Sequence, residues 1–217
     1  MLGGMNIPRL APLVCAVFVS GAAGQPQADA PSDISSESGV DAMIDVDASL
    51  SLDHGGAFGA ADSQYWGITG GVGFALEEND DSTDANLAIT YHRFLIDDFE
   101  FIGEVGGWYF SQDGDDAGGI NPGFTLRWHF VNRDRWTLYA DAGIGLLFTT
   151  DDVPDGGSSF DFMPRAGGGV SFRLDDRGTR GYVGARWHHI SNARINGDSA
   201  NPDRDGVTLY GGVMFPF

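Results

Sequence analysis

Three residues near the C-terminus are of the types that hydrolyse esters. His189 and Ser191 are separated by a single residue, and Asp205 lies further along the chain. A serine hydroxyl becomes a good nucleophile when a histidine accepts its proton and a carboxylate fixes the tautomer of that histidine. Residues i and i+2 of a β-strand point to the same side, so a strand would place His189 and Ser191 on one face. Nucleophilic catalysis then requires that Asp205 reach the same face.

The segments that carry these residues alternate with a period of two. In residues 178–191 one face holds Val183, Ala185, Trp187, His189 and Ser191. The opposite face holds Tyr182, Arg186 and His188, so we expect His188 to be structural. In residues 205–217 the face of Phe217 includes Asp205. If the two segments are adjacent strands, the acid, the histidine and the serine share one face at one depth.

The same alternation runs through the whole chain from residue 64 onward. We expect strands at about 64–77, 84–95, 99–112, 119–130, 135–149, 160–174, 178–191 and 205–217. Short turns alternate with longer, mostly acidic loops, and the chain ends in an aromatic residue. An even number of such strands predicts an all-β fold, an eight-stranded antiparallel transmembrane β-barrel of the outer membrane.

The two faces of these strands differ in a way that a soluble β-sandwich does not require. One face is apolar and aromatic, and the other carries charged residues of both signs. The interior of an eight-stranded barrel is just wide enough for side chains to fill it. Because an unpaired buried charge is costly, we expect ion pairs inside the barrel. The predicted partners are Arg127, Arg165 and Arg186 with Glu100, Glu104 or Asp141.

The chain before residue 64 has a different character. Residues 1–24 have an early Arg9, an unbroken apolar run and small residues at the end, which is typical of a secretory signal peptide. The apolar run is too short to span a bilayer as a helix. Residues 25–63 are expected to be a disordered or lead-in segment, and the pattern leaves open whether residues 40–60 add a strand.

Composition excludes several classes of function. The net charge is −19, and a nucleic-acid-binding protein needs a basic face to neutralise phosphates. The single cysteine, Cys15, lies in the predicted signal peptide, so the mature chain has no disulfide and no cysteine ligand for a metal. We expect neither a metal nor a cofactor.

The block His189-Ile190-Ser191-Asn192-Ala193, followed by Asn201-Pro202 and Asp205 before a final strand, resembles the lipid A 3-O-deacylase family of PagL-like acyloxyacyl hydrolases. The similarity covers about residues 64–217 and is weak before residue 119. This resemblance implies an outer-membrane barrel of eight strands that removes the 3-O-linked acyl chain of lipid A. It implies lipopolysaccharide as the substrate and the outer membrane as the location.

Carried over by position, Ser191 is the nucleophile, His189 the general base and Asp205 the orienting acid. The family usually has Glu at the acid position, and the shorter Asp205 places its reach to His189 in question. Asp203 and Asp198 are the fallback acids. Asn192 and nearby backbone N–H groups are candidates for the oxyanion site, and Asn201 is a candidate for binding substrate or fixing the loop.

Two alternatives to the enzyme remain at this point. A non-catalytic small outer-membrane barrel, structural or adhesive, would carry the same polar residues simply as its rim. An exported soluble β-protein would purify without detergent. The sequence also leaves open whether the protein is a monomer or a homodimer.

Overall fold

The structure is a computed structural model that describes residues 58–77, 80–195, 197 and 201–217. The predicted signal peptide and most of the predicted lead-in segment lie outside these residues. Eight strands follow one another along the chain: β1 (Gln64–Ala75), β2 (Thr83–Ile96), β3 (Phe99–Ser111), β4 (Ala117–Arg133), β5 (Trp136–Thr149), β6 (Phe160–Arg173), β7 (Arg180–Ile190) and β8 (Arg204–Pro216). Each pairs antiparallel with its neighbours, and β8 pairs with β1 to close a barrel. The predicted eight-stranded barrel is confirmed.

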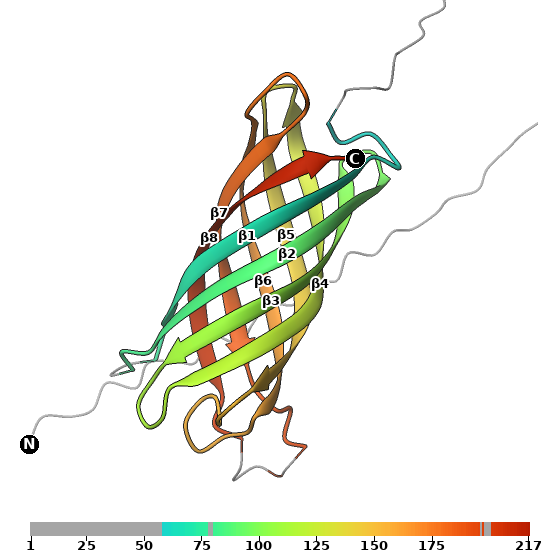
Figure 1. The fold of residues 1–217 in the computed structure, drawn as a ribbon. Coiled ribbons are helices and arrows are strands. Elements are labelled where there is room, and N and C mark those ends of the chain that lie inside the picture. Colours follow the sequence, from blue (N-terminus) through green and yellow to red (C-terminus); the bar gives the residue numbers. More distant parts are fainter. Residues whose placement is uncertain (1–57, 78–79, 196, 198–200) are drawn as a thin grey trace, which may run out of the picture. The chain divides into compact units, whose positions relative to one another are not determined.

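The connections between strands fall into two groups, one at each end of the barrel. Those at 97–98, 134–135 and 174–179 have two, two and six residues and share one end with the C-terminus, whereas those at 76–82, 112–116, 150–159 and 191–203 have five to thirteen residues and share the other end (Figure 1). Short turns face the periplasm in outer-membrane barrels, and long loops face the exterior. Within the described residues, no helix has the length and apolar character needed to cross a membrane.

The expected strands match the observed ones closely, and the largest difference is in β4. This strand extends to Ala117 and Arg133, beyond the expected 119–130. Its pairing with β5 shifts by one residue between Trp128 and Val131, which is a β-bulge. A bulge changes the alternation of faces locally, so a strict period of two cannot locate the end of this strand.

The barrel interior holds the predicted charge network. Arg127 contacts Asp141 at 3.2 Å and Glu100 at 3.3 Å. Arg186 contacts Asp141 at 3.0 Å, and Arg165 contacts Glu104 at 2.6 Å. All three predicted arginines therefore pair inside the barrel, and each removes the cost of leaving a buried charge uncompensated.

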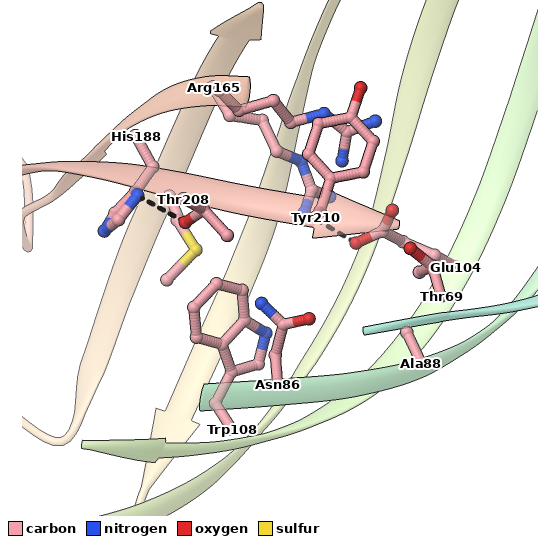
Figure 2. Close-up of a pocket in the computed structure, with 11 residues that line it drawn as sticks. Thr69, Asn86, Ala88, Glu104, Trp108, Arg165, His188, Thr208 and Tyr210 are labelled. Atoms are coloured by element: carbon pink, nitrogen blue, oxygen red, sulfur yellow. Dashed lines mark hydrogen bonds and ion pairs between the residues drawn. The ribbon is translucent and has the colours of Figure 1, made fainter. Parts of the chain in front are cut away.

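A small cavity remains in this interior. It has a volume of about 30 Å³ and lies beside Arg165, Glu104 and His188 (Figure 2). A buried water needs about 10–15 Å³ by this measure, so the cavity has room for only a few waters. Side chains therefore fill almost all of the barrel interior around this cavity.

The described part of the lead-in segment closes the end of the barrel that has the short turns. Phe58 is 7% exposed and packs edge-on against Phe94 and His129. The guanidinium of Arg180 lies 3.9 Å from the centre of the Phe58 ring. Residues 58–63 form turns, with no strand among them. This segment thus supplies an aromatic plug to the barrel.

Candidate active site

The candidate site lies on the outer face of β7 and β8, beside the longer loops. His189 and Asp205 are direct cross-strand partners in the β7–β8 pair. Ser191 continues the outward face beyond β7, and its backbone exchanges hydrogen bonds of 2.8 and 3.2 Å with Phe162 of β6. In the pairing of β6 with β7, the residue of β6 that lies opposite His189 is Pro164. Proline has no N–H to donate to the neighbouring strand. The ladder is therefore interrupted beside His189.

The register brings the acid and the histidine into hydrogen-bond contact. His189 Nδ1 lies 2.9 Å from Asp205 Oδ1. A residue with a short side chain can make this contact because directly opposite residues of antiparallel strands have Cβ atoms only about 4.5–5.5 Å apart. With Nδ1 bonded to the carboxylate, Nε2 is the nitrogen left to accept a proton from a serine.

Ser191 has the expected outward orientation and is partly exposed. In the described part of the chain its hydroxyl makes no hydrogen bond with His189. Two residues on one face of a strand are separated by about 6.5 Å along the backbone, so their side chains must lean together to touch. Hydrogen bonds between catalytic groups are often long without substrate and shorten in the complex.

The turn after Ser191 is held by two asparagines. Asn201 Oδ1 accepts a hydrogen bond of 2.9 Å from the backbone N–H of Asn192, whose own Oδ1 accepts one of 2.9 Å from the N–H of Arg194. Ala193 and Arg194 have φ values of 53° and 63°, a left-handed conformation that costs about 1 kcal/mol or more per non-glycine residue. Asn201 therefore fixes the loop. An oxyanion role for the N–H of Asn192 would require this bond to be exchanged.

The other acids near the site are placed differently. Asp203 is exposed, and its Oδ2 is 4.0 Å from His189 Nε2, on the side of the ring that Ser191 would need. Asp198 lies outside the described residues. His188 points inward, is 2% exposed and contacts Thr208 Oγ1 at 3.0 Å, as expected of a structural residue.

Two further side chains contact Asp205 and were not singled out from the sequence. Trp187 Nε1 donates a hydrogen bond of 3.1 Å to Asp205 Oδ1, and Glu77 Oε1 accepts one of 2.6 Å from the Asp205 N–H. The parity of Trp187 was a usable signal, because it shares a face with His189. Glu77 lies in a loop, where alternation gives no information. No cluster of three or more metal-binding side chains occurs among the residues that the structure describes.

A known protein family matches most of the chain. The model of the lipid A 3-O-deacylase (PagL) family matches residues 46–213. The chain belongs to this family. Membership of the PagL family places the protein in the outer membrane, which confirms the predicted location and the resemblance seen in the sequence.

Solved structures show the same architecture. Neisserial surface protein A is 15% identical with a TM-score of 0.51, and the match covers 71% of this chain and 97% of that one, which supports the fold alone. The outer membrane enzyme PagL is 18% identical with a TM-score of 0.49, and the match covers 70% of this chain and 99% of that one. No curated protein matches the sequence.

Proposed function

We propose that this protein is a serine esterase that removes the 3-O-linked acyl chain from lipid A, with Ser191 as nucleophile, His189 as general base and Asp205 as orienting acid. The contact of 2.9 Å between His189 Nδ1 and Asp205 Oδ1 on the lipid-facing surface carries the proposal. Ionisable residues at the lipid face are costly and mark functional sites. Membership of a lipid A 3-O-deacylase family supports the substrate.

The reaction follows from the roles of the three groups. Ser191 Oγ attacks the ester carbonyl carbon while His189 Nε2 takes its proton, and Asp205 stabilises the imidazolium. The tetrahedral intermediate collapses, the C–O bond to the sugar breaks, and the imidazolium protonates the leaving alkoxide. Water, deprotonated by His189, then attacks the acyl-enzyme and releases a fatty acid. Asn192 and the backbone N–H groups next to it remain the candidates for the oxyanion site, and Asn201 remains a candidate for binding substrate or fixing the loop.

The position of the site suits a lipid substrate. His189 and Asp205 lie at the outer ends of their strands, next to the loop at 191–203. The ester bonds of lipid A lie just below the headgroups of the outer leaflet. A cluster on the outside of the barrel at this depth can reach such a bond without taking the lipid out of the membrane.

Mass spectrometry of lipid A from cells that express the protein tests the proposal. Wild type should convert lipid A to a form that lacks one ester-linked acyl chain, and Ser191→Ala should leave it unchanged. Ser111→Ala, a serine at the same end of the barrel on β3, is the matched control and should behave as wild type. Heat-modifiable gel mobility shows that each barrel is folded.

Other outcomes have clear meanings. A folded Ser191→Ala variant that still releases the acyl chain excludes Ser191 as nucleophile. A folded wild type that leaves every lipid A ester intact supports the alternative of a non-catalytic barrel. Enzymes and structural barrels of this size share the fold, so only the chemistry separates them.

A further inference from the structure

The indole of Trp187 contacts both partners of the His189–Asp205 pair. Its Nε1–H donates to Asp205 Oδ1 at 3.1 Å, and the same oxygen lies 2.9 Å from His189 Nδ1. The rings of Trp187 and His189 are stacked, with centroids 6.1 Å apart and planes inclined by 24°. One carboxylate oxygen is thus shared by two aromatic rings from the same strand.

The register explains how one oxygen serves both rings. His189 lies directly opposite Asp205, whereas Trp187 lies opposite Val207, two pairs further toward the membrane centre. The diagonal neighbour in an antiparallel pair is within reach of a large aromatic side chain. Trp187 therefore reaches Asp205 diagonally, and its stacked ring limits the tilt of the imidazole.

The backbone of Asp205 is already fixed by the start of the loop that follows β1. Leu76 N–H donates to the Asp205 carbonyl at 2.9 Å, and the Asp205 N–H donates to Glu77 Oε1 at 2.6 Å. With its backbone held, Asp205 can still rotate its side chain. Because the Asp205 side chain is 47% exposed, solvent alone would not define the direction of its carboxylate.

A second carboxylate competes for the same imidazole. Asp203 Oδ2 is 4.0 Å from His189 Nε2, and its side chain is 66% exposed. If the imidazole turned toward Asp203, Nε2 would no longer be available to Ser191. Stacking on Trp187 and the shared oxygen of Asp205 both favour the orientation in which Nε2 is free.

We propose that Trp187 is a positioning residue of the site, which holds the Asp205 carboxylate and the His189 ring in the orientation needed for proton transfer. This inference rests on the proposed function. Trp187 is 41% exposed on the lipid face, where aromatic residues usually serve as interfacial anchors. The hydrogen bond to Asp205 gives it a role that an anchor does not have.

Steady-state kinetics on the purified protein in detergent micelles, with lipid A as substrate, tests this role. Trp187→Phe keeps an aromatic ring and removes the donor. We expect kcat to fall about 3- to 10-fold, the size of effect of one modest hydrogen bond, with KM unchanged. Trp66→Phe is the matched control, because Trp66 is 42% exposed on β1 at the opposite rim, and it should leave kcat unchanged. A rise in KM with constant kcat would assign Trp187 to lipid contact and overturn the proposal.

A double-mutant cycle separates positioning from anchoring. In an Asp205→Ala background the acceptor is gone, so adding Trp187→Phe should cost little further activity. Equal losses in the wild-type and Asp205→Ala backgrounds would show that Trp187 acts without Asp205, and would overturn the proposal.

Nuclear magnetic resonance of the indole N–H gives a readout that does not depend on activity. The signal of Trp187, identified by its loss in Trp187→Phe, should shift in Asp205→Asn and stay in place in Asp203→Asn. A signal that Asp205→Asn leaves unchanged overturns the positioning role. An inactive wild type with a shifted signal supports the contact and refutes only the proposed function.

Discussion

Asp141 and Asp205 both lie in hydrogen-bonded clusters, and the surroundings of these two carboxylates differ sharply. Asp141 is buried and accepts hydrogen bonds from Arg127, Arg186 and Tyr210, at 3.0–3.2 Å. Asp205 is half-exposed on the outer face and accepts from His189 and Trp187. Two cations compensate the buried acid, whereas a histidine that can gain or lose a proton faces the outer one.

This difference suggests separate roles: the inner cluster stabilises the barrel, and the outer cluster serves the proposed reaction. A buried carboxylate between two arginines cannot change its partners without leaving a charge uncompensated, so its cluster is rigid. The outer cluster is partly exposed, so a change of protonation there leaves no fully buried charge uncompensated. Substitutions in the two clusters should therefore affect different measurements.

The largest expected effect is on activity, at the histidine of the outer cluster. His189→Ala removes the base, and the rate of lipid A deacylation should fall on the order of 10⁴-fold or more, by analogy with other triads. The urea midpoint of unfolding should stay close to that of wild type. A large loss of stability would mean that the two regions are not separate.

A smaller loss is expected at the acid. Asp205→Ala leaves the base in place and removes the group that orients it, so the rate should fall on the order of 10²–10⁴-fold. The same lipid A assay measures it. If a folded Asp205→Ala kept full activity, the acid would have to be sought at Asp203 or Asp198.

The inner cluster should show the opposite behaviour. Asp141→Ala leaves Arg127 and Arg186 without their shared carboxylate, and removing one partner of a buried ion pair costs about 3–5 kcal/mol. The midpoint of urea unfolding should fall accordingly. The activity per folded molecule should remain near wild type, and an unchanged midpoint would contradict the role assigned to the network.

The smallest effect is expected at an exposed ion pair. Arg173 Nη2 lies 2.8 Å from Asp134 Oδ1 at the end with the short turns, and the Asp134 side chain is 69% exposed. Solvent screens such pairs, so Asp134→Ala should change the free energy of unfolding by about 1 kcal/mol or less. A loss as large as that of Asp141→Ala would show that burial does not set the strength of these pairs.

Alternation predicted the fold because lipid and a charged interior impose opposite requirements on successive residues. The inward direction of Arg127, Arg165 and Arg186 followed from parity alone, as did the outward direction of His189. Parity could not choose between Asp203 and Asp205, which have the same parity. The choice between them depends on the β7–β8 register, which the long loop at 191–203 leaves undetermined in the sequence.

Phe58 shows a different limit of sequence reasoning. Its segment contains glycines and has no sustained period, so the pattern gave only a lead-in segment. The packing of Phe58 against Arg180 and Phe94 depends on strands that are distant in the sequence. Trp187 was likewise placed on the correct face, but its bond to Asp205 becomes visible only with the register.

The clamping of Asp205 by Leu76 and Glu77 ties the site to the seam between the first and last strands. A chain that has not yet joined β8 to β1 lacks these two contacts with the acid. The full set of contacts to Asp205 is therefore complete only when β8 has paired with β1 and the barrel has closed.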